Sequence, residues 1–291
     1  MILRATHTTV YEYATPASES HNEVRLMPIH NGVQKLLDFR ITVDPYTPIF
    51  SYERPGGMVH HFGIRAPHDH LVIRAEATVE TFKSNPFEGL NLINDDFDFY
   101  RSDAVKQGFA EYLSASPYIS NSPGAVDIAE LARKEGSDSA ATFLLALSRL
   151  LNSSLAYDPD ATHVHSTVDE VIDGKAGVCQ DFSHLMIACA RSQGIPARYV
   201  SGYLYVEKDD EGMRGEEATH AWVECLMPDG NWAGFDPTNN LMSSDHYIKV
   251  HIGRDYGDVT PTKGVYVGTP ATRLDVKVAV SQVESVVGAS V

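Results

Sequence analysis

The order of apolar and polar positions separates a strand-rich first third of the chain from a remainder that contains helices. Up to about residue 99, short segments alternate apolar and polar residues, and turn-forming stretches such as TPAS, HNG and RPGG separate them. This alternation predicts half-buried strands in ILRATHTTVYEY, EVRLMP, LLDFRITVDP, GMVHHFGIRA and HLVIRAEATVETF. We therefore expect residues 1–99 to form an antiparallel β domain.

Helical spacing begins after the acidic, aromatic segment NDDFDFY. Ser102 precedes apolar residues at helical spacing and is suited to cap a helix, and two further helices are predicted at about 125–135 and 138–155. Another helix starts around Cys179 in GVCQDFSHLMIACARSQG and stops at its closing glycine, which is followed by a proline. Helices therefore dominate the middle of the chain.

Strand patterns return in ARYVSGYLYVE, THAWVECLM and WAGFDPT, and a last alternating segment, LDVKVAV, lies near the end. Helices followed by strands predict an α+β architecture. We expect residues 100–291 to form this α+β core, with LDVKVAV as a C-terminal strand extension.

Composition and charge narrow the classes of partner. The 291 residues are 43% hydrophobic and 21% charged, which is ordinary for a globular chain of one large or two smaller domains. The net charge is −16 and no basic cluster occurs, which argues against nucleic acid or an anionic membrane surface as partner. No apolar run approaches the roughly 18 residues of a membrane-spanning helix, and the N-terminus does not resemble a signal peptide. We expect a cytoplasmic protein.

The chain has three cysteines, too few and oddly numbered for a disulfide framework. Cys179 would occupy the first turn of its helix, where unpaired backbone N–H groups and the helix dipole favour a thiolate. Cys189 falls in the apolar interior of the same helix and Cys225 in a strand, so we expect both to be buried packing residues. Cys179 is therefore the candidate nucleophile.

The turn at 228–230, Pro-Asp-Gly, joins two predicted strands and sets an expected register. Paired positions should sum to about 457 or 458, which puts the partner of His220 at about 237, within a residue of Asp236. Opposite side chains on one sheet face have Cβ atoms about 5 Å apart, close enough for an imidazole and a carboxylate to hydrogen-bond. The carboxylate would hold the ring in one tautomer and stabilise the imidazolium.

Three blocks of sequence resemble the catalytic motifs of the transglutaminase-like superfamily, in its bacterial branch whose members are often called cysteine proteases. They are GVCQDFSHLMIACARSQGIPARYVSGYL, THAWVE and WAGFDPTNN, in which Cys179, His220 and Asp236 are separated by 41 and 16 positions. TVYEYATPASESHNEVRLMP resembles the β-rich N-terminal domain of bacterial members, and HIGRDYGDVTPTKGVYVG resembles the segment that follows the core. The resemblance covers nearly the whole chain.

The resemblance implies a papain-like core in which the cysteine helix packs on an antiparallel sheet. It implies that Cys179 is the nucleophile, His220 the general base and acid, and Asp236 the residue that orients His220. The reaction would be acyl transfer through a thioester, which passes to water or to an amine. No cofactor is implied.

An oxyanion also has to be stabilised in such a reaction, and the backbone N–H of Cys179 is the natural first donor. Gln180 and Trp222 lie beside members of the triad in sequence. Each is expected either to line the site, as a second donor or a cover, or to serve packing only.

Pairs of histidines suggest a metal site as an alternative. His68 and His70 would share a strand face, as would His163 and His165. Zinc usually takes three or four ligands, and no cysteine or carboxylate completes either pair at a recognised spacing. We therefore expect no metal.

Three functions remain open. The first is a cysteine amidase or peptidase that hydrolyses a peptide or amide substrate; the second is a transamidating enzyme with an amine acceptor; the third is a non-catalytic module that binds peptides or holds partners together. Hydrolysis is the default, because water is present at about 55 M and transamidation needs a site that excludes it. Unpaired strand edges also make a homodimer possible.

Overall fold

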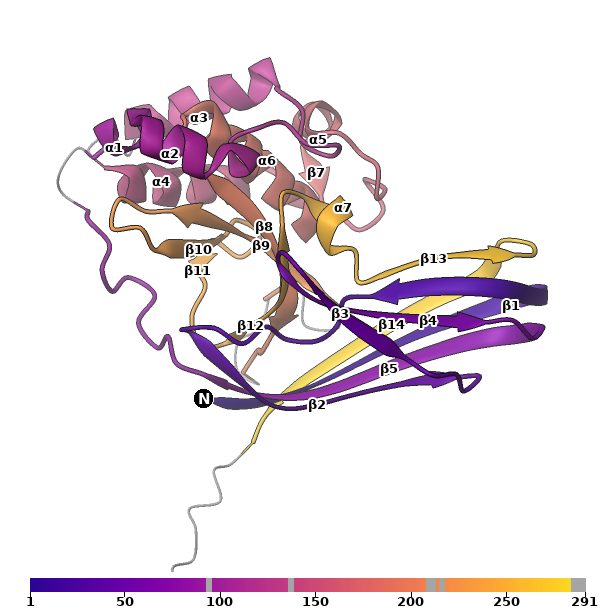
Figure 1. Cartoon of the computed structure of the whole chain (residues 1–291). Coiled ribbons are helices and arrows are strands. Elements are labelled where there is room, and N and C mark those ends of the chain that lie inside the picture. Colours follow the sequence, from indigo (N-terminus) through magenta and orange to yellow (C-terminus); the bar gives the residue numbers. More distant parts are fainter. Residues whose placement is uncertain (93–95, 136–138, 208–212, 215–217, 284–291) are drawn as a thin grey trace, which may run out of the picture.

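The structure, a computed structural model, describes residues 1–92, 96–135, 139–207, 213–214 and 218–283. They form an N-terminal antiparallel β half-barrel and an α+β core with its own antiparallel sheet, as Figure 1 shows. This is the fold class that the sequence predicts.

The half-barrel is a seven-stranded sheet whose main path has the order β2-β5-β1-β4-β3. Its first strand is continuous, although the sequence suggests two strands with a turn between them. Its register against β5 shifts between Glu12 and Ala17, and from Ser20 onward it pairs with β4. The strands on the main path are β1 (Ile2–Val24), β2 (Gln34–Asp44), β3 (Phe50–Arg54), β4 (Gly57–Ile64) and β5 (His68–Thr81).

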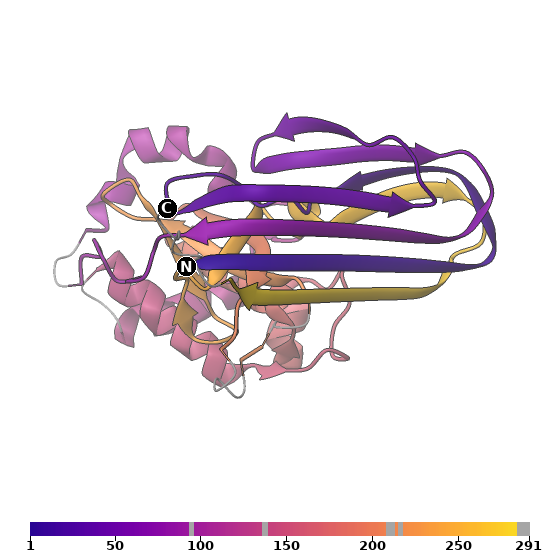
Figure 2. The ribbon, with the colours of Figure 1, turned by 90° about the horizontal axis from the view of Figure 1, so that it is seen from below.

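The end of the chain returns to this sheet. Strands β13 (Thr262–Val267) and β14 (Ala271–Gln282) both pair with β1, and the β14 ladder runs from Leu3 opposite Gln282 to Tyr13 opposite Ala271. Figure 2 shows β14 beside β1 along the edge of the half-barrel. The expected strand extension therefore exists, but it belongs to the N-terminal sheet and not to the 100–291 core in which we placed it.

The core contains a five-stranded antiparallel sheet with the order β11-β10-β9-β8-β12. Its strands are β8 (Ala197–Leu204), β9 (His220–Leu226), β10 (Trp232–Asp236), β11 (Leu241–Met242) and β12 (Tyr247–Gly253), and β6 (Ala156–Tyr157) pairs in parallel with β7 (Ala176–Gly177) apart from it. The helices are α1 (Asp98–Arg101), α2 (Asp103–Gly108), α3 (Pro123–Glu135), α4 (Ala140–Ser154), α5 (Val168–Gly174), α6 (Cys179–Ser192) and α7 (Tyr256–Val259), with a 3₁₀ turn at Ala110–Tyr112.

The predicted helices occur near their expected positions. Ser102 caps α2 by accepting the backbone N–H of Val105. The helix expected at 138–155 is α4, and its first expected residue, 138, lies outside the described residues. Ser139 and Thr142 form a capping box there, which explains why α4 begins at Ala140.

The core sheet lies between the helices and the half-barrel (Figures 1 and 2). Ala221, Val223 and Cys225 of β9 belong to the large apolar cluster that includes the interior of α6. A second apolar cluster joins the sheet to the half-barrel through Tyr203 and Ile248. Each large apolar side chain buried in such a layer stabilises the fold by about 1.5–3 kcal/mol. Within the described residues, no helix is long and apolar enough to cross a membrane.

Candidate active site

Cys179 is the first residue of α6, and the residues before it adopt an extended conformation. Asp181 fixes this start, because its Oδ2 accepts the backbone N–H of Val178 at 2.8 Å and the hydroxyl of Thr162 at 2.6 Å. Burial raises the pKa of Asp181, although both hydrogen bonds act against the shift. Asp181 therefore holds the helix start and the loop that contains Thr162.

The first turn of α6 also presents backbone donors. In the described part of the chain, the N–H groups of Cys179 and Gln180 meet no acceptor, as is usual for the first residues of a helix. Two adjacent N–H groups beside a sulfur atom can bind an oxygen that gains negative charge.

His220 and Asp236 meet across two neighbouring strands, β9 and β10. His220 Nε2 lies 2.7 Å from Asp236 Oδ2, and both side chains are fully buried. The ladder pairs Trp232 with Leu226 and Phe235 with Val223, so paired positions sum to 458, one of the two values that the turn predicts. His220 would pair directly with position 238. Asp236 lies two positions earlier on the same sheet face, so it is the diagonal neighbour of His220.

Asp236 accepts four further hydrogen bonds. Its Oδ1 accepts the backbone N–H groups of Thr238 at 3.0 Å and Asn239 at 3.2 Å. Its Oδ2 accepts the Asn239 side-chain amide at 2.8 Å and the Tyr247 hydroxyl at 2.9 Å. Burial raises the pKa of Asp236, but the charge of His220 and these hydrogen bonds outweigh burial and lower it. The carboxylate is therefore held in its charged form.

Sequence reasoning did not find Asn239 and Tyr247 as part of this site. Asn239 belongs to the FDPTNN block and lies three residues after Asp236, so a turn that folds back on the carboxylate was a usable signal. Tyr247 comes from β12, at the far edge of the sheet order, and no local pattern marks it.

The other ring nitrogen of His220, Nδ1, is buried and has no hydrogen-bond partner among the described residues. Cys179 is close enough to act on the ring, since it raises the pKa of His220 together with Asp236. Burial lowers the pKa of His220, and Asp236 together with Cys179 outweighs burial and raises it to about 10. The protonated form of the ring is therefore favoured.

Three tyrosines surround Cys179, which is half-buried. Burial is the main cause that raises the pKa of Tyr157, Tyr199 and Tyr256, and Cys179 adds to the shift of each. Tyr157 and Tyr256 pack at the edge of the main apolar cluster together with Cys179. Three tyrosines therefore lie in the electrostatic neighbourhood of Cys179.

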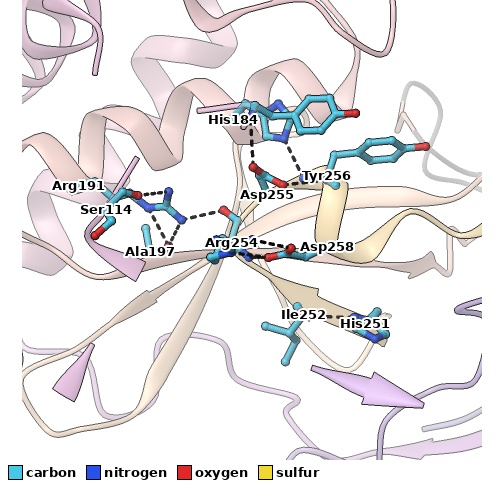
Figure 3. A network of polar contacts seen from close by, with 12 residues as sticks. Ser114, His184, Arg191, Ala197, His251, Ile252, Arg254, Asp255, Tyr256 and Asp258 are labelled. Atoms are coloured by element: carbon cyan, nitrogen blue, oxygen red, sulfur yellow. Dashed lines mark hydrogen bonds and ion pairs between the residues drawn. The ribbon is translucent and has the colours of Figure 1, made fainter. Parts of the chain in front are cut away.

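A polar network keeps α7, and with it Tyr256, against α6 (Figure 3). His184 Nε2 accepts the backbone N–H of Tyr256 at 3.1 Å, and burial lowers the pKa of His184 to about 4. Asp255 accepts the backbone N–H of Tyr118 at 3.1 Å. Arg191, at the other end of α6, donates to the carbonyls of Ser114, Ala197 and Arg254. These bonds hold Tyr118 and Tyr256 in place beside α6.

The two flanking residues differ in their side-chain donors, because the amide of Gln180 is bonded whereas the buried Nε1 of Trp222 has no partner among the described residues. Gln180 Nε2 donates to the Val164 carbonyl at 3.0 Å, so its amide holds the neighbouring loop. Trp222 is wholly buried and lies beside the ring of His220, with centroids 6.2 Å apart and planes at 27°. Gly202 allows this packing, because a Cβ there would lie 2.5 Å from the Trp222 ring. Trp222 therefore packs beside His220 out of reach of solvent.

The other two cysteines and the predicted pair His68 and His70 lie away from Cys179, whereas His163 and His165 flank Val164, whose carbonyl accepts the Gln180 amide. Cys189 and Cys225 are fully buried, and burial raises the pKa of both thiols. His70 pairs with Asp69 and Asp44 on the half-barrel. Among the residues that the structure describes, no three side chains of the metal-binding types gather at one place.

A helix that begins at a cysteine and packs on an antiparallel sheet with a buried histidine–carboxylate pair defines a transglutaminase-like α+β protein. Residues 129–237 match the transglutaminase-like superfamily, and residues 3–80 match the bacterial transglutaminase-like N-terminal region. The chain belongs to the transglutaminase-like superfamily and has the N-terminal region of its bacterial members.

Three similar proteins illustrate this membership. An uncharacterized Mycobacterium leprae protein is 36% identical over 282 residues, which cover 96% of this chain and 98% of that protein. A Pseudomonas aeruginosa protein-glutamine gamma-glutamyltransferase is 31% identical over 121 residues, 40% of this chain and 18% of that protein. The crystal structure of a "Putative Cysteine Protease" from Cytophaga hutchinsonii has a TM-score of 0.72 at 21% identity, covering 98% of this chain and 92% of that one. The similarity to the Cytophaga hutchinsonii structure is a similarity of fold.

Proposed function

We propose that the chain is a cysteine-dependent acyl-transfer enzyme that hydrolyses amide bonds, an amidase or peptidase with Cys179, His220 and Asp236 as its catalytic triad. The observation that carries this proposal is the buried His220–Asp236 pair, whose unpartnered Nδ1 is available to Cys179 at the start of α6. Asp236 orients the ring through Nε2, which leaves Nδ1 for the thiol.

The reaction follows from this geometry. The Cys179 thiolate attacks the amide carbonyl, a C–S bond forms, and the oxygen that becomes charged meets the N–H groups of Cys179 and Gln180. His220 gives its Nδ1 proton to the departing amine as the C–N bond breaks. Water then attacks the thioester, His220 takes one of its protons, and the acid leaves as the Cys179 sulfur is released.

Transamidation uses the same residues and is the second candidate, favoured by the aromatic surroundings of Cys179. Tyr157, Tyr199 and Tyr256 exclude water from part of the site, which is the condition under which an amine can compete for the thioester. Hydrolysis remains the proposal, because an amine also needs a binding site of its own. A module that binds peptides without turnover is the third candidate.

Intact-mass measurement of the acyl-enzyme separates these functions. The protein is mixed with a set of blocked peptide p-nitroanilides, quenched in acid and weighed, with and without added ethanolamine. We expect an acyl adduct on Cys179 and a carboxylic acid product, which are absent in Cys179→Ala and present in Cys189→Ala. Ethanolamide as the main product would favour transamidation, and peptide binding with neither adduct nor product would contradict catalysis.

A further inference from the structure

A cavity of about 780 Å³ adjoins the residues that hold Asp236. Thr238, Asn239 and Tyr247 line it, and all three make the hydrogen bonds to Asp236 described above. Its size is within the range of about 300–1,000 Å³ that is typical of small-molecule sites. We call it the Arg214 cavity, after the arginine in its wall.

The wall of the Arg214 cavity is complementary to an anion. Arg214 is the one Lys or Arg among its described lining residues, and no Asp or Glu occurs among them, although the chain has 39 acidic against 23 basic residues. Within the described residues Arg214 forms no ion pair. His246 also lines the cavity and lies 3.9 Å from Glu207. One fixed positive charge in this wall is thus left to a ligand.

Two hydroxyl groups in the same wall also lack a partner. Ser148 Oγ and Thr238 Oγ1 are buried and bond to no described residue. Ser148 is 2% exposed and Thr238 1% exposed. On folding, each hydroxyl therefore loses its hydrogen bonds to water and gains none to the described residues. Buried polar atoms of this kind usually meet a ligand or an ordered water. Both hydroxyls can donate to a carboxylate.

Arg214 is tied directly to the triad. Its backbone N–H donates to Asn239 Oδ1 at 2.9 Å, and its carbonyl accepts Asn239 Nδ2 at 3.1 Å. The same Nδ2 donates to Asp236 at 2.8 Å. This arrangement fixes the start of the Arg214 side chain relative to the catalytic carboxylate.

The guanidinium of Arg214 is close to the surroundings of the nucleophile. It lies over the ring of Tyr157, 5.0 Å from its centroid. The Tyr157 hydroxyl also interacts electrostatically with both Arg214 and Cys179. Tyr157 pairs with Gly177, two residues before Cys179, so the cation lies over a side chain that neighbours the start of α6.

We propose that Arg214 pairs with a carboxylate of the substrate, so that the enzyme selects peptides or amides with a free carboxylate close to the bond that is cleaved. This inference rests on the proposed function, because it names the substrate class of that site. The planar guanidinium can hold both oxygens of a carboxylate at once. A neutral substrate would instead leave the cation and the two hydroxyls unpaired.

Three thiol-reactive probes test the inference without knowledge of the natural substrate. They are N-iodoacetyl-glycyl-glutamine amide, which is neutral, the corresponding glutamate amide, with a side-chain carboxylate, and N-iodoacetyl-glycyl-glutamine, with a C-terminal carboxylate. Labelling rates at Cys179 are measured by mass spectrometry at pH 9, where an ordinary thiol also reacts. The comparison therefore stands even if Cys179 is not catalytically activated.

We expect one acidic probe to label Cys179 at least about tenfold faster than the neutral probe. A tenfold difference is the affinity gain that one charge-assisted hydrogen-bonded pair provides. The faster probe identifies the carboxylate as a side-chain or a C-terminal one. The preference should disappear in Arg214→Gln, persist in part in Arg214→Lys, and remain complete in Arg65→Gln, an exposed arginine of the half-barrel. Equal rates in the wild type, or a preference that survives in Arg214→Gln, would overturn the inference.

Discussion

Replacing Asp236 by Asn should leave His220 neutral with its proton on Nδ1, while changing little in volume. Oδ1 faces two backbone N–H groups, so the amide oxygen of Asn takes that position and its NH₂ takes the place of Oδ2. That NH₂ would point at His220 Nε2, the Tyr247 hydroxyl and the Asn239 amide. Nε2 must then accept a hydrogen bond, so the ring is neutral and carries its proton on Nδ1, toward Cys179.

The size of the effect follows from the environment of His220. Burial lowers its pKa, yet Asp236 and Cys179 raise it from 6.5 to about 10. A shift of this size corresponds to about 5 kcal/mol, or about 10³ in favour of the imidazolium. Without the carboxylate, only Cys179 opposes the effect of burial, and we expect the ring to be neutral at pH 7. We expect the rate at which iodoacetamide labels Cys179 at pH 6 to fall at least about 100-fold.

Stability should change with pH in a defined direction. Because the folded-state pKa of His220 is raised, its contribution is complete below pH 6.5, the ordinary value, and is lost as the pH rises toward about 10. The free energy of unfolding of the wild type should therefore fall between pH 7 and 10. In Asp236→Asn this part of the pH dependence should be absent.

Two assays check these expectations. Nitrogen-15 NMR of the imidazoles, with His220→Gln to assign the signal, gives the tautomer and the pKa, and mass spectrometry gives the labelling rate. Asp69→Asn is the matched control, because that side chain is 76% exposed on the half-barrel. A His220 signal that still titrates near 10 in Asp236→Asn, or an unchanged labelling rate, would refute the reasoning.

Two further changes test the surroundings of the site. Tyr247→Phe removes one hydrogen bond from Asp236 and should lower the Cys179 labelling rate roughly tenfold. Tyr46→Phe, at an exposed tyrosine, should leave the rate unchanged. Equal labelling rates in the two variants would contradict the role of Tyr247. Glu224→Gln leaves Arg198 and Lys249 without their fully buried partner and should cost about 3–5 kcal/mol in urea unfolding. Glu76→Gln, at an exposed pair with Arg74, should cost less than about 1 kcal/mol, and similar losses would contradict this account.

Local patterns were enough to predict the elements that carry the candidate triad. The glycine and proline after α6 mark its end, and the 228–230 turn sets the register between β9 and β10. Turn chemistry and strand period are local properties, so a short sequence window contains them. For this reason the pairing of His220 with Asp236 could be predicted before any tertiary contact was known.

Contacts between distant segments were not predictable in the same way. Nothing within β14 indicates that it pairs with β1, because its alternation fits the edge of either sheet. Tyr247, Tyr256 and Arg214 reach the site through β12, α7 and a hydrogen bond to Asn239. Side chains placed by such long-range packing have no periodic or motif signal, so their part in the site emerged only from the structure.

The pH dependence of Cys179 alkylation by iodoacetamide, in the wild type and in His220→Ala, tests the central claim most directly. Cys189 and Cys225, both buried, serve as references within the same spectrum. The account predicts rapid labelling of Cys179 at pH 6 that is lost in His220→Ala, because His220 keeps the thiol proton. Labelling that rises only around pH 8.5 in both proteins, as for an ordinary thiol of pKa about 8.5, would contradict it.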